Sequence, residues 1–561
     1  MYIKPRYLPA GDQAIVVEFG NQICIDTNRK VYGLLSALHN RGVSGIIEMV
    51  PTYRSLLVYY QPDVLPWKLL LQELENAIGV LAGPEGRDWE IPTLYGGEAG
   101  PDLVEVAEYC GLKPQEIIDL HSKGEYRVYM LGFTPGYPYL GGMDHRIAVP
   151  RLKTPRTETP AGSVGIAGNQ TGIYPVTSPG GWRIIGRTPL KLFDPLRQPP
   201  VLVQSGDTIR FVPITEERYQ QLKEAVECET AALAALHETA DAGGTPFFEV
   251  IRPGLLTTVQ DLGRVGYQAY GVPVAGAMDR FSLRIANILV GNPEGEAALE
   301  ITVFGPRLEV VCDGVVAVTG GDLGAALDGK PMPQWEAVPV KAGSVISFAG
   351  PRQGCRSYLA VAGGIAVPEI MDSKSTYLRG KFGGLYGRQL QAGDLLRIGP
   401  PRSKKEWAKR GGIPRNLLSP LVHPGEVRVV LGPQDDYFDQ EAIHTFLSSE
   451  YMIKPESDRM GYRLEGPLVK PKEADIISDG IPLGAIQIPA DGSPIILLAD
   501  RQTTGGYPKI ATVISPDIGK LAQAKPGDRL VFRQVTMEEA NSLYCQEEKV
   551  IARIKQLVGY V

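Results

Sequence analysis

Cysteine is scarce in this 561-residue sequence, and the six cysteines are scattered without one C-x-x-C pair. Neither a disulfide framework nor a zinc site is therefore expected. Histidine is equally scarce, with six residues, and none lies in the densest motif blocks. We therefore interpret the histidines as surface or packing residues and expect no histidine-based catalytic triad.

Several familiar catalytic motifs are also missing. The sequence has no G-x-x-x-x-G-K-[ST] phosphate loop, no G-x-G-x-x-G after a strand, no H-E-x-x-H and no G-x-S-x-G. The amidase signature and the Met-Lys-Met turn that carries biotin are absent as well. These absences exclude the standard nucleotide-binding, zinc-protease and serine-hydrolase architectures, and they predict no covalent biotin on this chain.

The sequence has no excess of positive charge and no long apolar run. Its formal charge is -6 and its pI is near 5.7, so DNA and RNA are not expected partners. No segment has the length that spans a bilayer, and the first twenty residues lack the features of a signal peptide. We therefore expect a cytoplasmic protein without a membrane partner.

Glycine and proline are abundant, with 65 and 46 residues, and they predict many tight turns and short strands. The length predicts several domains, and a polar, alanine-rich stretch near residues 216–246 separates two halves. We expect a mixed α/β, β-rich fold of two tandem halves, each a small α/β or β domain followed by a β-barrel. The predicted units are 1–85, the barrel 86–218, a helical linker 219–245, 246–400, a connector 401–424, the barrel 425–545 and a C-terminal helix 546–561.

The two halves share a pattern of glycines. Ile166 is followed six residues later by Gly172 and then by a Gly-Gly-aromatic triplet at 180–182, while Ile486 is followed six residues later by Gly492 and then by a similar triplet at 505–507. This spacing predicts two barrels built on one plan, although chance similarity between glycine-rich turns is the alternative.

Apolar residues at helical spacing predict packing helices at 64–80 and at 280–290, the second capped by Asp279.

Two blocks of the first half have the composition of a binding site. Residues 130–144 combine glycine and proline with Phe133, Tyr137 and Tyr139, which suits a rigid ligand-facing loop or a loop packed on its own aromatics. In residues 149–189, arginines alternate with glycines whose backbone N–H groups could approach an anion. Surface ion pairs are the alternative explanation for these arginines.

The second half contains two further polar blocks. Residues 257–279 combine Gln260, Asp261, Arg264 and Asp279 with a glycine-broken run. In residues 477–510, a polar cluster follows an apolar strand directly. Because a carboxamide offers both a donor and an acceptor, the glutamines at 487 and 502 suit recognition of a neutral amide.

These blocks closely resemble the allophanate hydrolase subunit 1 and subunit 2 families, also called the 5-oxoprolinase B and C subunits or Kip-type families. The resemblance rests on GFTPGYPYLGG, PAGSVGIAG, SPGGWRIIGRTP, QDLGR, GYQAYGVPVAGAMD, SDRMGYRLEG, SDGIPLGAIQIPADG and LLADRQTTGGYPKIATVI. It covers nearly the whole chain, with the B-type half at about 1–220 and the C-type half at about 245–545. It implies that each barrel is cyclophilin-like and that a site lies between the barrels.

The resemblance implies an enzyme that activates the lactam of 5-oxoproline with ATP and Mg²⁺, while a separate protein, the LamB/YcsF-type A subunit, completes hydrolysis to glutamate. We expect the catalytic residues Gln487, Asp500, Gln502 and Arg187. The expected substrate-binding residues are Tyr137, Ser163, Gln170, Trp182, Asp279, Thr503, Thr504 and Tyr507. The expected cofactor-binding residues are Arg151, Arg156, Gly180 and Gly181, and the sequence does not identify metal ligands.

Two other functions are compatible with the same resemblance. Related barrels occur in the carboxyltransferase part of urea carboxylase, which moves a carboxyl group from biotin to an amide nitrogen. Kip-type proteins also include inhibitors of a histidine kinase, although the polar block DRQTTGGYP favours retained chemistry. The sequence leaves the oligomeric state open, including a homo-oligomer.

Overall fold

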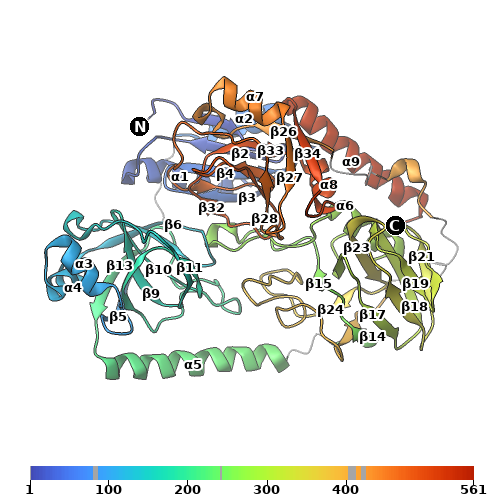
Figure 1. The fold of residues 1–561 in the computed structure, drawn as a ribbon, viewed down its shortest axis with the longest axis horizontal. Coiled ribbons are helices and arrows are strands. Elements are labelled where there is room, and N and C mark those ends of the chain that lie inside the picture. Colours follow the sequence, from blue (N-terminus) through green and yellow to red (C-terminus); the bar gives the residue numbers. More distant parts are fainter. Residues whose placement is uncertain (1, 80–85, 240–242, 402–411, 419–424, 561) are drawn as a thin grey trace.

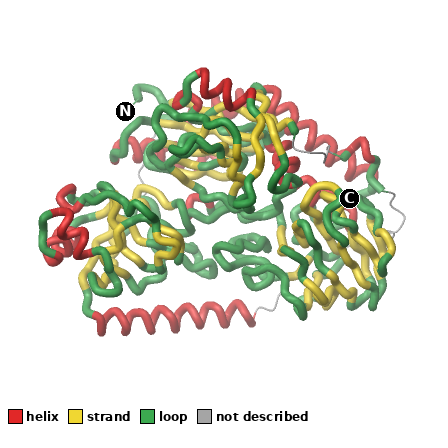
Figure 2. The backbone as a smooth tube through the Cα atoms, viewed as in Figure 1, coloured by secondary structure: helices red, strands yellow, loops and turns green. Residues whose placement is uncertain are grey.

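The computed structural model describes residues 2–79, 86–239, 243–401, 412–418 and 425–560. It has four strand-rich bodies: an N-terminal domain, a first barrel, a two-sheet domain and a second barrel (Figure 1). Loops and turns fill the space where these bodies meet (Figure 2). The expected mixed α/β, strand-rich fold of two tandem halves is confirmed.

The N-terminal domain is an antiparallel sheet of order β1-β2-β4-β3 with two helices on one face. Ile15, Val17 and Leu56 pack against the helices, whereas Leu57 on the opposite face contacts the second barrel near Gly480. The helix predicted at 64–80 is present and is shorter. The elements are β1 (Arg6–Pro9), β2 (Ala14–Glu18), α1 (Ile25–Arg41), β3 (Ile46–Pro51), β4 (Ser55–Tyr60) and α2 (Trp67–Ala77).

The first barrel has the strand order β10-β9-β12-β5-β13-β6-β7, and β8 and β11 form a separate two-stranded antiparallel sheet. Helices α3 (Leu103–Cys110) and α4 (Pro114–Lys123) follow its first strand. The strands are β5 (Asp88–Tyr95), β6 (Tyr126–Leu131), β7 (Pro138–Gly141), β8 (Arg156–Thr159), β9 (Ser163–Ala167), β10 (Gln170–Ile173), β11 (Ser178–Gly180), β12 (Arg183–Arg187) and β13 (Thr208–Pro213).

The second barrel is closed, and β29 and β32 form its own two-stranded antiparallel sheet. Helices α7 (Gln440–Ser448) and α8 (Ser515–Ala522) belong to it. The strands are β26 (Glu426–Leu431), β27 (Glu450–Ile453), β28 (Gly461–Glu465), β29 (Asp479–Gly480), β30 (Ala485–Gln487), β31 (Ile495–Leu497), β32 (Thr504–Gly505), β33 (Lys509–Val513) and β34 (Arg529–Gln534).

The two barrels follow one plan, as the glycine pattern predicted. Starting at β31, the second barrel runs β31-β30-β33-β26-β34-β27-β28, which matches the first barrel strand for strand. In each barrel the first and last strands pair in parallel, and the other strand pairs are antiparallel. Ile166 and Ile486 lie on equivalent strands, and Gly180 and Gly505 lie in equivalent two-stranded sheets.

The two-sheet domain packs a seven-stranded sheet on a five-stranded sheet around an apolar core. Helix α6 (Arg280–Val290) covers the outer face of the smaller sheet, and the Asp279 side chain caps it as predicted. The strands are β14 (Thr245–Arg252), β15 (Leu256–Gln260), β16 (Ala298–Thr302), β17 (Arg307–Val310), β18 (Gly314–Asp322), β19 (Ala325–Leu327), β20 (Lys330–Pro331), β21 (Ala337–Val340), β22 (Val345–Phe348), β23 (Gln353–Val361), β24 (Ile365–Ala366) and β25 (Leu395–Ile398).

Two long helices lie outside these bodies. Helix α5 (Glu216–Thr239) begins three residues before the predicted linker and runs along the lower edge of the view (Figure 1). Helix α9 (Met537–Leu557) begins at 537 rather than at the expected 546, because the Thr536 side chain caps it there by accepting from the Glu539 backbone N–H. It packs Ala540 on the second barrel and Ile551 on α6.

Parts of three predicted segments lie outside the described residues. These are 80–85, at the end of the predicted N-terminal unit, 240–242, in the predicted helical linker, and 402–411 with 419–424, in the predicted connector. Within the described ranges, no helix combines the length and the apolar character needed to cross a bilayer.

Candidate functional site

A cleft lies where the N-terminal domain, the two-sheet domain and the second barrel meet, and we call it the junction cleft. It consists of an inner cavity of about 120 Å³ and an outer cavity of about 410 Å³. The cavities adjoin, because they share the lining residues Gln13, Ile47, Arg280, Leu483, Ser515 and Ile518. Ligand sites commonly form at such domain junctions, and the outer cavity has a size typical of them.

A chain of hydrogen bonds closes one wall of the inner cavity. Arg501 donates from Nη2 to the Tyr59 hydroxyl and to Gln268 Oε1, both at 3.0 Å. Gln268 in turn donates through its backbone N and its Nε2 to the two oxygens of Glu48, each at 2.7 Å. Burial raises the pKa of Glu48. These hydrogen bonds join the N-terminal domain, the two-sheet domain and the second barrel. Because the polar groups are already paired, this wall has a structural role.

Asp12 brings a buried carboxyl from the N-terminal domain to the inner cavity. Its Oδ1 accepts from the backbone N of Ser515 at 2.9 Å and from the Ser515 hydroxyl at 3.0 Å, at the start of α8. Its Oδ2 has no hydrogen-bond partner among the described residues. The side chain is 2% exposed, and burial raises its pKa to about 6. Asp12 is therefore poised to change protonation near neutral pH.

Arg280 is the cationic group with the most free donors in the junction cleft. It is the first residue of α6, and within the described part of the chain its one hydrogen bond runs from Nη2 to the Leu262 carbonyl at 3.1 Å. The side chain remains accessible to solvent. Desolvation by the surrounding domains, followed by repulsion from Arg284, lowers the pKa of its guanidinium. Its remaining N–H groups are available to an anionic ligand.

Glu547 is the acidic counterpart of Arg280 in the outer cavity. It projects from α9, and none of the described residues forms a hydrogen bond or ion pair with its carboxyl group. Burial, followed by repulsion from Asp279 and Glu548, raises its pKa to about 7. The nearby Arg284 cannot compensate fully, because it is bound by Glu294 at 2.7 Å and by both oxygens of Glu548.

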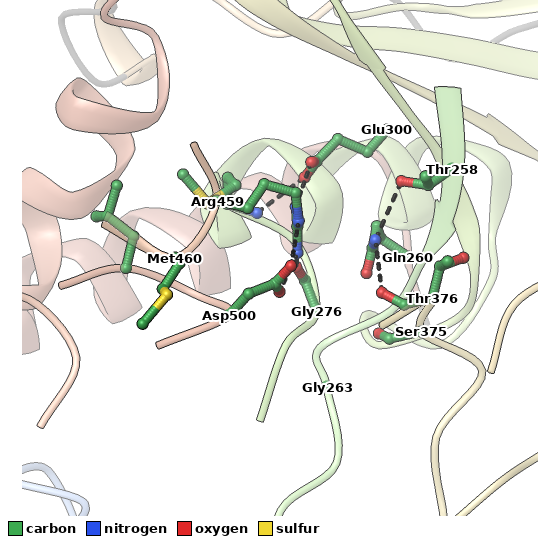
Figure 3. A network of polar contacts seen from close by, with 12 residues as sticks. Thr258, Gln260, Gly263, Gly276, Glu300, Ser375, Thr376, Arg459, Met460 and Asp500 are labelled. Carbon is green, nitrogen blue, oxygen red and sulfur yellow. Dashed lines mark hydrogen bonds and ion pairs between the residues drawn. The ribbon is translucent and has the colours of Figure 1, made fainter. Parts of the chain in front are cut away.

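A buried ionic network fixes the loop that leads to Arg280 (Figure 3). Arg459, in the β27–β28 loop, binds both oxygens of Asp500 at 3.0 and 3.1 Å, and it also pairs with Glu300 of β16. Its Nη2 donates to the Gly276 carbonyl at 2.6 Å, while Glu300 accepts from the Met278 backbone N at 2.8 Å. The second barrel, the two-sheet domain and the loop before α6 are thus held by one guanidinium.

Most of the predicted residues of the second half do not line this cleft. Asp279 lines the outer cavity and is the one predicted site residue that lines either cavity, but its carboxylate is held by Ser282 and by Gln523. Asp500 is occupied by Arg459. The Thr504 hydroxyl accepts from the Phe133 backbone N at 3.0 Å, so it joins the two barrels. Their proposed catalytic and binding roles stay predictions.

Gln487 belongs to a separate buried cluster on the second barrel. It lies opposite Lys509 in the β30–β33 pair, and Gly505 approaches the amide groups of Gln487 and Gln502. The Lys509 ammonium lies 3.8 Å from Asp479, and burial lowers its pKa. Thr503 is buried nearby on the same loop, whereas Tyr507 is 40% exposed. This cluster lines neither cavity of the junction cleft.

The aromatic residues of the first half pack on one another. The Tyr137 ring lies 5.3 to 5.9 Å from the rings of Phe133, Tyr139, Tyr174 and Trp182. Gln170 donates to the Tyr53 hydroxyl at 2.9 Å, and the Ser163 hydroxyl is buried without a described partner. These contacts favour the alternative that the loop at 130–144 packs on its own aromatics.

The predicted cofactor arginines do not converge on one site. Arg156 pairs with Asp102 at 2.6 Å, which supports the surface ion-pair alternative for this residue. Arg187 lines another cavity with Tyr219 of α5, and Arg151 is exposed. Gly180 packs against the Tyr174 hydroxyl, and Gly181 lies near Pro155.

Sequence analysis missed the residues that define the junction cleft, which are Asp12, Gln13, Arg280, Ser515 and Glu547. A polar turn directly before a buried strand was the available signal for Asp12 and Gln13. Glu547 looks like any charged residue of an amphipathic helix, so the sequence offered no signal for it.

Comparison with known proteins identifies both halves of the chain. The carboxyltransferase domain family matches residues 270–534 with its subdomain A and B model and residues 5–203 with its subdomain C and D model. The C subunit of the Escherichia coli 5-oxoprolinase is 42% identical over 52% of this chain and 92% of that protein. The B subunit of the Bacillus subtilis 5-oxoprolinase is 45% identical over 40% of this chain and 99% of that protein. The chain belongs to the family of 5-oxoprolinase B and C subunits, with both halves on one polypeptide.

Two further proteins are similar to this chain. A crystal structure of TTHA0988 matches 93% of this chain and 99% of that chain, with a TM-score of 0.81 and 34% identity. The urea amidolyase of Saccharomyces cerevisiae is 37% identical over 55% of this chain, but the match covers only 18% of that protein. Sequence of this kind therefore also occurs as one part of a longer chain.

We expect Arg459→Met to lower the free energy of unfolding by about 3 to 5 kcal/mol, because it leaves Glu300 and Asp500 buried without their cation. Urea denaturation followed by tryptophan fluorescence measures the change in the first unfolding transition. Arg463→Met, at an exposed position on β28, is the matched control and should stay within about 0.5 kcal/mol of the wild type. Equal stabilities of the two variants would contradict the structural role of the network.

Asp12 also predicts a pH dependence of stability. Its pKa is raised in the folded protein, so the stability associated with its neutral form is present below about pH 4 and is lost as the pH rises to about 6. Relative to Asp12→Asn, the wild type should lose up to about 3 kcal/mol of unfolding free energy between pH 4 and pH 7. Denaturation series at each pH measure this difference, with Asp475→Asn at an exposed position as the control. A difference that does not change with pH would show that Asp12 is not desolvated.

Proposed function

We propose that this chain is the fused B and C component of an ATP-dependent 5-oxoprolinase. With a separate protein, the LamB/YcsF-type A subunit, it converts 5-oxoproline to glutamate. The proposal is supported chiefly by coverage: the chain matches 92% of a 5-oxoprolinase C subunit and 99% of a B subunit, but only 18% of a urea amidolyase. Proteins that match each other over their whole length are expected to share more of their function than proteins that match along one segment.

The junction cleft supports a small amide as the substrate. The outer cavity, of about 410 Å³, has room for a small ring with its substituents, since a cavity of about 150 Å³ binds benzene. Its walls combine apolar side chains, such as those of Leu262 and Phe281, with the charged groups of Arg280 and Glu547. A five-membered lactam offers an apolar ring with one amide group, and these walls match both features.

The outer cavity does not form a cradle for the phosphates of ATP. The outer cavity has five carboxyl-bearing residues, Asp63, Asp279, Glu294, Glu547 and Glu548, against the cations Arg280, Arg284 and Lys520. Across the described ranges, no group of three or more His, Cys, Asp or Glu side chains is placed to hold a metal ion. The requirement for ATP and Mg²⁺ in this proposal therefore rests on the named relatives.

A biotin-dependent carboxyltransferase is the second candidate function. It is favoured by the carboxyltransferase domain models and by the crystal structure of the Kluyveromyces lactis urea amidolyase, which matches 71% of this chain with a TM-score of 0.53. Both candidate reactions act on an amide, so the junction cleft is compatible with either one.

The test of the proposed function combines the purified chain with a LamB/YcsF-type partner, ATP, Mg²⁺ and 5-oxoproline. We expect glutamate and ADP to form only in the complete mixture, and enzymatic assays of both products measure this. The partner preparation is first shown to be active with the B and C subunits of the Escherichia coli enzyme. If it is active with them and not with this chain, the proposal is wrong, and transfer of a carboxyl group from biotin to urea becomes the next assay.

A further inference from the structure

The outer cavity contains two opposite charges that the protein leaves unused. The Arg280 guanidinium makes one hydrogen bond to a described residue, and the Glu547 carboxyl makes none, although both line the same cavity of about 410 Å³. The neighbouring cations Arg284 and Lys520, by contrast, are already paired with Glu548 and Asp517. Ionisable groups that line a cavity with shifted pKa values and without a protein partner are candidates for ligand binding.

No hydrogen bond or ion pair joins these two groups in the part of the chain that the structure describes. The charges that act on Glu547 are Asp279, Glu548, Arg284 and Asp12, and the effects on Arg280 come from Arg284, Tyr544, Arg501 and Asp261. The remaining charged groups that line the cavity are Asp63, Glu294 and Lys520. A ligand that joins Arg280 and Glu547 must therefore offer an anion to the first and a hydrogen-bond donor to the second.

We propose that the outer cavity binds a small molecule carrying both a carboxylate and an amide N–H, with the carboxylate on Arg280 and the N–H donated to the Glu547 carboxylate. This inference rests on the proposed function, and it assigns the residues that would select 5-oxoproline. Glu547 lies beyond residues 270–534, so the match to the carboxyltransferase domain family does not include it. The N–H contact discriminates against an isosteric lactone, which has a ring oxygen at that position.

The charge state of Glu547 gives this proposal a distinctive signature. An N–H group binds the deprotonated carboxylate, whereas a lactone oxygen can only accept a hydrogen bond from the protonated acid. Because the pKa of Glu547 is raised to about 7, the deprotonated fraction increases about tenfold between pH 6 and pH 8. The affinity for the lactam should rise by about that factor, and the affinity for the lactone should fall.

Isothermal titration calorimetry of the full chain with 5-oxoproline and with 5-oxotetrahydrofuran-2-carboxylate tests this at pH 6, 7 and 8. We expect opposite pH trends for the two ligands in the wild type and flat trends in Glu547→Gln. Glu538→Gln changes an exposed carboxyl on the same helix and should behave like the wild type. Arg280→Met should weaken both ligands at least about tenfold, because both carry the carboxylate. Thermal unfolding confirms that each variant is folded.

The outcomes separate this inference from the proposed function. If 5-oxoproline binds without a pH trend, or if Glu547→Gln keeps the trend, the role of Glu547 is wrong while the function stands. If the wild type binds neither ligand at any pH, the site is wrong, and the glutamate assay with the partner then decides whether the function is wrong too.

Discussion

The junction cleft depends on one buried guanidinium. Arg459 comes from the second barrel, yet it reaches the carboxylate of Glu300 in the two-sheet domain and the Gly276 carbonyl in the loop before α6. Burying a charge is favourable only when its partners are well placed, so the two bodies cannot shift relative to each other without a large cost. The same contacts fix the path of the chain into α6, which sets the position of Arg280.

The other sides of the cleft come from elements that are distant in the sequence. Asp12 reaches Ser515 across 503 residues, and Asn541 of α9 donates to the Asp12 carbonyl at 2.9 Å. Helix α9 then continues to α6, where Glu548 pairs with Arg284. One helix thus contacts three bodies and carries Glu547 into the outer cavity. The cleft exists only when both halves of the chain are assembled, which suits a fusion of two subunits.

Much of the fold could be predicted from the sequence because it depends on local patterns. The glycines after Ile166 and Ile486 predicted two barrels on one plan, and the apolar spacing after Asp279 predicted α6 with its cap. The start of α9 was missed by nine residues, since the capping role of Thr536 was not recognised. Short polar caps of this kind are easily overlooked when apolar periodicity alone sets a boundary.

The cleft could not be predicted in the same way. Polar residues that follow strands, such as Asp500 and Thr504, have the pattern of functional residues, yet the structure uses them to hold the bodies together. Glu547 is unusual only because tertiary packing desolvates it beside Asp279 and Glu548, and no local pattern encodes that environment. Residues that share a cleft because domains meet leave no spacing signal in a single sequence.

The most direct test of this account is a crystal structure of the chain with 5-oxoproline bound. The account predicts electron density for the ligand in the junction cleft, with its carboxylate at Arg280 and its ring nitrogen facing Glu547. Density for the ligand beside Gln487 and Gln502 on the second barrel, with the junction cleft unchanged, would contradict it.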